Sequence, residues 1–358
     1  MRLSELGWTE DRARQFDAAK GGRPDLYPGR VGVAFNYMYR CYVEGAEWDA
    51  VVAGRLRHRA SRQSELPVVG DWVVMRRRGD EVQAAITEVL PRAGSFSRKE
   101  AGETTDEQVV AANIDVVFVV MALDADFSPR RIERYLLLTR EGGARPVVLL
   151  TKPDLCADLP QAVAAVAVVT GTTPVHVVGP RTGAGMAQLA EYLAAGTTCA
   201  LLGSSGVGKS TIVNWLGGRD VQRTQEVRES DAKGRHTTTH RELVPIPGGG
   251  VLVDTPGMRE IQLWEAREAV EQTFEDLESL APGCRFGNCR HRDEPRCAVK
   301  AAVESGALAA ARLASYLALQ DEMDSLAARQ DVRARLEDKR LAKVAGKALA
   351  QRLRQKGR

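Results

Sequence analysis

The pattern of hydrophobic and polar residues changes along the chain. A polar segment of about 28 residues comes first, and β-rich hydrophobic runs follow at 30–39, 50–56, 71–76 and 82–89. Glycine, proline and charged residues separate these runs. Short strands at this spacing predict a small antiparallel barrel, a fold that often binds RNA.

A different pattern, in which strands and helices alternate, covers residues from about 106 to 262. Residues 115–123 (DVVFVVMAL) form a continuous apolar run, typical of a strand buried on both faces. A helix is predicted next, because Ser128 is a suitable N-cap, Pro129 fits the first turn and the glycine pair at 142–143 ends it. Further strands are predicted at 146–150, 174–178, 198–202 and 250–253. The alternation predicts a mostly parallel, doubly wound α/β sheet, which binds ligands at the carboxyl ends of its strands.

The last part of the chain contains a Cys/His cluster followed by long helical stretches. We therefore predict an N-terminal segment (1–28), a β-barrel (29–95), an α/β domain (96–262) and a helical domain (263–358). Between Arg329 and Arg358, 11 residues are Lys or Arg and 3 are Asp or Glu. A basic helix of this kind can neutralise RNA phosphates, although a solvated terminal helix would have the same composition.

The composition fits a protein of several globular domains. The chain has 358 residues, of which 44% are hydrophobic and 27% charged, and this balance excludes a disordered or fibrous protein. With 50 Lys and Arg against 47 Asp and Glu, the net charge is only +3, so any nucleic-acid surface must come from local clusters. Basic residues gather at 55–62 and 76–78 on the predicted barrel, where they fit either an RNA-binding surface or a solvated strand edge.

No segment of the sequence has the pattern of an export signal or a membrane span. The N-terminal residues MRLSELGWTEDR carry acids and no apolar segment. The uncharged stretch 161–180 is interrupted by Gly, Thr, Pro and His. We therefore expect a cytoplasmic protein without a membrane span. The chain has no coiled-coil seam, and we expect a monomer.

A phosphate-binding loop is the clearest motif. Residues 203–210 (GSSGVGKS) fit the pattern G-x-x-x-x-G-K-[ST] between an apolar strand and a predicted helix, as this motif requires. Gly206 and Gly208 allow backbone N–H groups to approach phosphate oxygens. Lys209 would reach the β- and γ-phosphates, and Ser210 is the expected Mg²⁺ ligand. The predicted nucleotide-binding residues are Gly203, Ser204, Ser205, Gly206, Val207, Gly208, Lys209, Ser210 and Thr211.

A second motif indicates which base is bound. Thr151, Lys152, Pro153 and Asp154 follow the apolar strand VVLL and resemble the guanine-specificity motif NKxD of GTPases. Asp154 would accept hydrogen bonds from N1–H and the exocyclic amine of guanine, donors that adenine does not offer there. The stem of Lys152 would lie along the base plane. Thr151 replaces the usual Asn, and taken alone the four residues also fit a simple turn after a strand.

Two further segments complete the predicted hydrolytic site. Asp254 and Gly257 belong to DTPG, where the acid can support the Mg²⁺ shell and the Gly257 N–H can contact the γ-phosphate. The stretch 234–239 (GRHTTT) fits a switch segment in which Thr238, or a neighbouring Thr, would bind Mg²⁺. Met258 stands where a catalytic Gln would follow DTPG. His236 is therefore the candidate for orienting the attacking water, although a His in such a loop can also be structural.

The order of these motifs differs from that of ordinary GTPases. Those proteins carry the phosphate loop first, whereas here 151–154 precede 203–210 and DTPG comes last. The loop 179–185 stands where a Ser-Ala pair is usual, and it begins with Gly179-Pro180 instead. The sequence thus resembles a circularly permuted GTPase, in which strands that still align would preserve the pocket.

The C-terminal part contains a predicted metal site formed by Cys284, Cys289, His291 and Cys297. Three thiolates with one imidazole form a closed tetrahedral zinc set, and such a set is structural because it leaves no open position. The alternatives are free cysteines beside a surface His, or a redox-labile regulatory site. The other three cysteines are scattered, which argues against a disulfide framework.

Together these stretches resemble the ribosome small-subunit-dependent GTPase A family. The resemblance rests on GRLRHR (54–59), LPVVGDWV (66–73), SFSRK (95–99), TKPD, GSSGVGKST, GRHTTT, DTPG and the Cys₃His spacing. It implies an oligonucleotide-binding (OB) barrel, a permuted GTPase domain and a zinc-containing helical domain. It further implies GTP and GDP as ligands, the small (30S) ribosomal subunit and its rRNA as partners late in subunit maturation, and ribosome-stimulated GTP hydrolysis.

The expected reaction is hydrolysis of GTP to GDP and phosphate by in-line attack of water. Lys209 would stabilise the developing charge and Asp154 would select guanine. The protein alone should be slow, since no Gln follows DTPG. Two alternatives remain open: a P-loop ATPase or nucleotide kinase without guanine preference, and an RNA-binding scaffold whose nucleotide site barely turns over.

Overall fold

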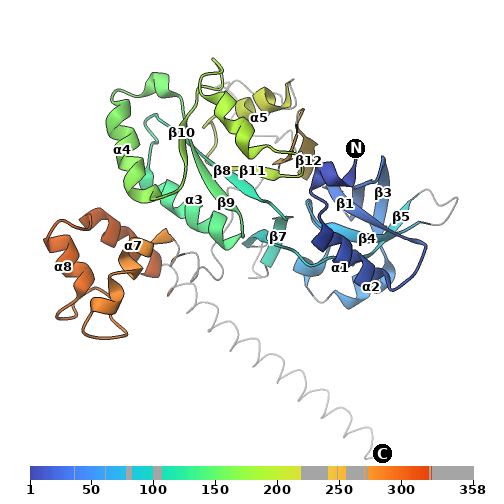
Figure 1. Ribbon diagram of the computed structural model, residues 1–358, viewed down its shortest axis with the longest axis horizontal. Helices are drawn as coiled ribbons and strands as arrows, with labels where there is room; N and C mark the ends of the chain where they lie inside the picture. The colour runs from blue at the N-terminus through green and yellow to red at the C-terminus, as the bar shows by residue number, and fades with distance from the viewer. Residues whose placement is uncertain are drawn as a thin grey trace, which may run out of the picture. The chain divides into compact units, whose positions relative to one another are not determined.

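The structure is a computed structural model that describes residues 1–35, 37–60, 62–77, 83–99, 107–218, 241–247, 249–254, 270, 273–321 and 324 (Figure 1). The chain separates into two compact units, residues 1–273 and residues 274–358. Within the described ranges, no helix combines the length and the apolar character needed to cross a membrane.

A closed barrel forms from the first β-rich runs. The elements of this part are η1 (Leu3–Leu6), α1 (Glu10–Lys20), β1 (Leu26–Phe35), β2 (Met38–Val43), β3 (Ala46–Val52), α2 (Gly54–Arg59), η2 (Gln63–Glu65), β4 (Trp72–Arg76) and β5 (Ala84–Val89). The strands are neighbours in the order β1, β2, β3, β5 and β4, and β4 pairs again with β1. Val31, Cys41, Val73 and Ile86 fill its core. The predicted small barrel is confirmed, but it is not wholly antiparallel, because β3 and β5 are parallel.

Two predicted strands of the barrel have different bounds. The run 30–39 is divided into β1 and β2 by a turn in which Tyr37 takes a left-handed conformation, with φ of 66°. The run 50–56 stops at Val52, because residues 54–59 (GRLRHR) form α2 instead. Arg and Leu have good helix propensity and this segment has no β-branched residue, which explains the helix.

A buried arginine joins the N-terminal segment to the barrel. Arg30 of β1 is only 1% exposed, and its guanidinium donates to the carbonyl oxygens of Leu6 and Asn113, the latter at 3.2 Å. It also lies over the ring of Trp72. Burial lowers the pKa of Arg30 to about 10, so the side chain stays charged at neutral pH. The carbonyl oxygens thus satisfy a buried charge and tie three segments together.

A parallel sheet follows a separate hairpin made of β6 (Ser95–Lys99) and β7 (Glu107–Ala112). The next elements are β8 (Val116–Ala122), α3 (Pro129–Glu141), β9 (Arg145–Thr151), η3 (Pro153–Leu155), α4 (Leu159–Thr170), β10 (Val175–Val177), η4 (Met186–Tyr192), β11 (Thr198–Leu202), α5 (Lys209–Gly217), β12 (Arg241–Pro245) and β13 (Val251–Asp254). Strands β10, β9, β8, β11 and β13 are parallel neighbours in this order. The predicted parallel α/β sheet is confirmed, with its carboxyl strand ends along one edge.

Helices cover both faces of this sheet (Figure 1). On one face, Ile212 of α5, Met186 of η4 and Phe118 of β8 belong to the same hydrophobic core cluster. On the other face, α3 lies against β8 and β9, and α4 packs on α3. The start of α3 is as predicted, because the Ser128 hydroxyl accepts the N–H of Arg131.

Strand β12 is absent from the sequence prediction, yet it connects the barrel strands to the parallel strands. It pairs antiparallel with β13 on one side and with β1 of the barrel on the other. Over the described residues, the barrel and the parallel strands therefore form one 11-stranded sheet. The segment RELVP begins with two charges and ends with Pro, so local propensity does not favour a strand there.

The second unit begins with Phe274, which is fully buried. Its described elements are α7 (Glu275–Glu278), η6 (Ala281–Gly283), α8 (Ala298–Glu304) and a helical stretch at 310–321. Arg312 pairs with Asp276 at 3.0 Å and lies over the Phe274 ring, so the later helix is fixed to the start of the unit. The predicted basic helix at 329–358 lies outside the described residues.

Candidate functional site

The predicted phosphate-binding loop joins the carboxyl end of β11 to the start of α5. Gly206 and Gly208 have φ angles of 76° and 99°, a region that glycine adopts without strain. Lys209, the first residue of α5, donates its ammonium to the carbonyl oxygens of Gly203 (2.7 Å) and Ser204 (2.5 Å). The lysine therefore lies across the loop at a helix N-terminus, where anions are favoured.

The TKPD segment lies beside this loop. Thr151 ends β9 and is fully buried, and its hydroxyl donates to the carbonyl oxygen of Val207 at 2.6 Å. A Cβ added to Gly208 would lie 3.9 Å from Pro180 and 4.0 Å from Thr151, so three predicted segments meet here. Asp154 follows in η3 and is exposed. The Thr that stands in place of Asn thus bonds the TKPD segment to the phosphate loop.

Two residues outside the motifs also contact them. The ammonium of Lys152 pairs with the Asp124 carboxylate at 2.8 Å, and this hydrogen bond lowers the pKa of Asp124 below its ordinary value. Arg131, in the first turn of α3, donates to the Ser204 hydroxyl at 3.3 Å. Both residues follow the carboxyl end of β8, where α/β sheets place ligand-binding side chains, and that position is the sequence signal for them.

Part of the predicted hydrolytic site lies outside the described residues. His236, Thr238 and Gly257 fall there. Asp254 is the last residue of β13, and its backbone pairs with Glu242 of β12. Because β13 and β11 are parallel neighbours, the backbone of Asp254 ends at the same edge of the sheet as the strand that leads into the phosphate loop.

Replacing Gly203 with Ala is expected to disturb the loop while leaving its Lys and Ser in place. An added Cβ would lie 2.4 Å from the carbonyl oxygen of Val120 in β8, so the two strand ends must move apart. We expect a loss of about 1–3 kcal/mol in stability, as for overpacking, together with weaker nucleotide binding. Thermal unfolding should be compared with that of Gly54→Ala, where the methyl group meets no atom within 4 Å. An unchanged midpoint for Gly203→Ala would contradict this geometry.

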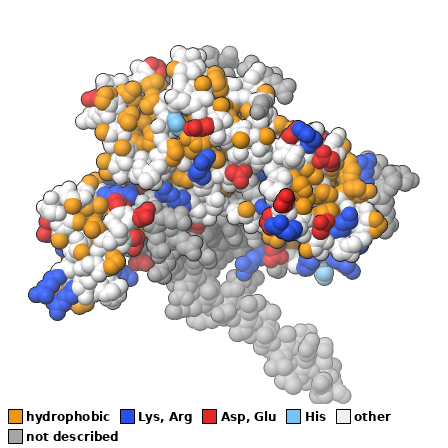
Figure 2. All heavy atoms as spheres, viewed as in Figure 1, with side chains coloured by type: hydrophobic (Ala, Val, Ile, Leu, Met, Phe, Trp, Pro, Cys, Tyr) orange, Lys and Arg blue, Asp and Glu red, His pale blue; other side chains and the backbone are white. Residues whose placement is uncertain are grey.

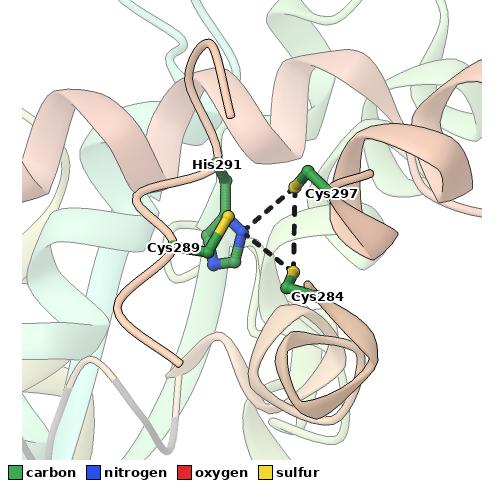
Figure 3. A group of neighbouring side chains, drawn as sticks. All are labelled: Cys284, Cys289, His291 and Cys297. Atoms are coloured by element: carbon green, nitrogen blue, oxygen red, sulfur yellow. Dashed lines mark hydrogen bonds between the residues drawn. The ribbon is translucent and has the colours of Figure 1, made fainter. Parts of the chain in front are cut away.

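The four predicted metal ligands lie together in the second unit (Figure 3). The ligand atoms of Cys284, Cys289, His291 and Cys297 are all within 4.8 Å of one another. The two sulfurs of Cys284 and Cys297 are 3.8 Å apart, and His291 Nδ1 lies 3.6 Å and 3.3 Å from them. Zinc bonds of about 2.3 Å to sulfur and about 2.0–2.1 Å to nitrogen give tetrahedral edges of about 3.8 Å and 3.5 Å. The donor set therefore fits one zinc ion.

The backbone around this cluster supports the ligands. His291 takes a left-handed conformation, with φ of 59°, and is buried together with Cys297. The Cys297 sulfur accepts the N–H of Lys300 at 3.4 Å, where α8 begins. An N–H donor of this kind stabilises a thiolate, and four protein ligands leave no open position for substrate. The arrangement is therefore that of a structural metal centre.

The fold and the order of the motifs define a circularly permuted P-loop GTPase. A solved structure described as YloQ, a circularly permuted GTPase, matches over 85% of this chain and 97% of its own with a TM-score of 0.63. At 23% identity it shows the shared fold. YjeQ from Thermotoga maritima has 26% identity and a TM-score of 0.63, over 83% of this chain and 98% of its own.

Sequence comparison identifies the family. The profile of the RsgA GTPase matches residues 89–264. The small ribosomal subunit biogenesis GTPase RsgA of Opitutus terrae is 44% identical over 356 residues, which cover 96% of each chain. The protein of that name from Methanosarcina acetivorans is 40% identical, over 95% of this chain and 90% of its own. The chain belongs to the RsgA GTPase family, as its motifs predict.

Proposed function

We propose that this chain hydrolyses GTP, binds the small ribosomal subunit and assists its late maturation, with turnover that the subunit stimulates. The bond from the Thr151 hydroxyl to Val207 carries the proposal, because it joins a guanine-type turn to a phosphate loop. The names of the relatives from Opitutus terrae and Methanosarcina acetivorans support the ribosomal part, since both are small ribosomal subunit biogenesis GTPases.

The described residues can bind both ends of GTP. Asp154 would accept the N1–H and the exocyclic amine of guanine, and the loop N–H groups would surround the phosphates. The Lys209 ammonium would exchange its present carbonyl partners for β- and γ-phosphate oxygens. Catalysis of phosphoryl transfer depends mainly on such positioning and charge stabilisation.

Oxygen ligands are available for Mg²⁺. Ser210 is the second residue of α5 and is half-buried beside Lys209, and we propose that it holds the ion together with Thr238, while Asp254 supports the hydration shell. When bound, Mg²⁺ neutralises charge on the phosphates. In this proposal the Gly257 N–H contacts the γ-phosphate and His236 orients the attacking water.

The barrel has a surface suited to RNA. Arg57 lies 5.0 Å over the ring of Tyr37, and Arg77 lies 4.9 Å over the ring of Trp48. Tyr37 and Arg57 also line a cavity of about 340 Å³. Figure 2 shows hydrophobic, basic and acidic side chains interspersed over the barrel. Aromatic rings and guanidinium groups can stack on unpaired bases, so we propose that the barrel contacts rRNA and that the basic tail adds phosphate contacts.

The remaining assignments follow from this function. We propose a cytoplasmic protein, because its ribosomal partner is there, and a monomer. We also propose functional divisions at 1–28, 29–95, 96–262 and 263–358, which assign the barrel and the metal-binding part to the subunit and the middle part to the nucleotide.

Phosphate release from GTP and from ATP, each with and without purified small ribosomal subunits, tests the proposal. We expect hydrolysis of GTP but not of ATP. The protein by itself should be slow, because Met258 stands where a water-orienting Gln would follow DTPG. Subunits should raise the rate about tenfold or more. Equal use of ATP would favour a general P-loop ATPase or kinase.

Lys209→Ala is the matched control for this assay, and it should abolish turnover. A scaffold role would be favoured if this variant bound subunits equally with GTP, with GDP and without nucleotide. If subunits do not change the rate of GTP hydrolysis, the protein must have a different partner.

A further inference from the structure

The connection between β8 and α3 contributes a carboxylate that no nucleotide-binding motif includes. We propose that Asp124 is a positioning residue for guanine nucleotides: it holds the Lys152 ammonium before the nucleotide arrives, so that the lysine stem is already placed beside the base. The inference rests on the proposed function, since it takes TKPD to be the guanine-reading turn.

Asp124 and Lys152 follow the ends of two strands, β8 and β9, which are paired with each other in the sheet. In the parallel ladder, Ala122 of β8 lies opposite Thr151 of β9. The backbone N–H of Leu123 then donates to the carbonyl oxygen of Thr151 at 2.9 Å. The residues that follow, Asp124 and Lys152, therefore have a separation that the sheet itself determines.

The carboxylate is oriented on both of its oxygens. Its Oδ2 accepts the Lys152 ammonium at 2.8 Å, and its Oδ1 accepts the backbone N–H of Asp126 at 3.1 Å. The Lys152 and Asp124 side chains are 34% and 26% exposed, so solvent weakens their attraction less than at an open surface. In the described part of the chain, Asp124 is the acidic partner found for Lys152.

The backbone of Lys152 also supports a fixed position. Its φ and ψ are 54° and 49°, in the left-handed region that residues with side chains seldom adopt. This conformation turns the chain from β9 into η3, where Asp154 lies. The turn sets the direction of the Lys152 backbone and the ion pair fixes the far end of its side chain.

Fixing a lysine side chain in advance should favour binding. A long side chain loses rotamer freedom when a ligand immobilises it, and a site that is ordered beforehand avoids most of that loss. GDP and GTP carry the same base, so Asp124 should strengthen both equally. The hydrolytic step takes place at the phosphates and should not depend on Asp124.

A double-mutant cycle on the full, zinc-loaded chain tests this role. Dissociation constants for GDP and for a non-hydrolysable GTP analogue should be measured for Asp124→Asn, Lys152→Met and the double variant. We expect Asp124→Asn to weaken both ligands about tenfold, and the double variant to be no weaker than Lys152→Met. For Asp124→Asn, the turnover number measured with saturating GTP and subunits should stay within about twofold of the value for the parent protein. Asp126→Asn, an exposed neighbour, is the control and should bind as the parent does.

Several outcomes would overturn the inference. Asp124→Asn could leave nucleotide binding unchanged, or it could tighten binding, which would mark Asp124 as a competitor for the lysine. The effects of the two substitutions could be strictly additive in the cycle. Asp124→Asn could also lower the turnover number and the melting temperature without any effect on binding. Asp154→Asn separates this inference from the proposed function. If Asp154→Asn weakens GDP and Asp124→Asn does not, only the role of Asp124 fails; if neither does, the guanine-reading turn fails as well.

Discussion

Asp154→Asn is expected to weaken GTP binding about 100-fold and to make xanthosine triphosphate the better ligand. Asp154 lies exposed in η3, which follows β9. The last residue of β9, Thr151, donates a hydrogen bond to the phosphate loop. An Asn amide can accept one guanine N–H but turns its own NH₂ toward the other. Bonds to a charged acceptor are worth about 1.5–3 kcal/mol, and about 2.8 kcal/mol corresponds to 100-fold in affinity. Competition titrations with GTP, ATP and xanthosine triphosphate measure the change.

The control for this substitution is Asp25→Asn, which removes an exposed carboxylate elsewhere in the first unit. It should leave all three affinities unchanged. If Asp154→Asn has no more effect than this control, the TKPD segment is an ordinary turn and a P-loop ATPase or kinase becomes the better assignment.

Removing zinc is expected to unfold the described part of residues 274–358 while the first unit keeps its fold. Structural zinc contributes about 10–16 kcal/mol of apparent binding energy, comparable to the whole stability of a small domain of about 5–15 kcal/mol. Among the described elements of this unit, α7, η6 and α8 are short and lie along the chain next to Cys284, Cys289, His291 and Cys297. Cys297→Ser, or a strong chelator, should therefore expose it to protease. Limited proteolysis and GDP binding should be measured together, and GDP binding should persist.

Cys156→Ser is the matched control, because Cys156 is a half-buried cysteine outside the cluster. Freshly purified protein should contain about one zinc ion per chain. Its absence, together with oxidised cysteines, would support the redox-labile alternative. Equal protease resistance before and after chelation would show that the metal does not hold this unit together.

The sequence predicts best those elements whose signals are local. Strand β8 is a continuous apolar run buried on both faces, and α3 begins at a Ser-Pro cap. The motif of the phosphate loop is eight residues long, 203–210, and it stands between a strand and a helix. Such features depend on neighbouring residues alone, so no tertiary information is needed to find them.

Features that depend on distant partners could not be predicted in this way. Strand β12 exists because β1 and β13 offer hydrogen bonds on both sides, although its own residues have weak strand propensity. The hydrogen bond of the Thr151 hydroxyl is a similar case, since its acceptor, the carbonyl oxygen of Val207, lies 56 residues away along the chain. Asp124 carries no motif, and only the sheet brings it to Lys152.

The permuted order also affects how the chain is made. The Thr151 hydroxyl and the Val207 carbonyl are 56 residues apart, with the donor synthesised first. At about 5–20 residues per second, the acceptor leaves the ribosome about 3–11 s after the donor. During that interval the nascent chain displays the TKPD turn, the proposed guanine-reading segment, without the phosphate loop. A nucleotide that needs both segments can therefore stabilise this protein only late in its own synthesis, after β8, β9 and β10 have already been made.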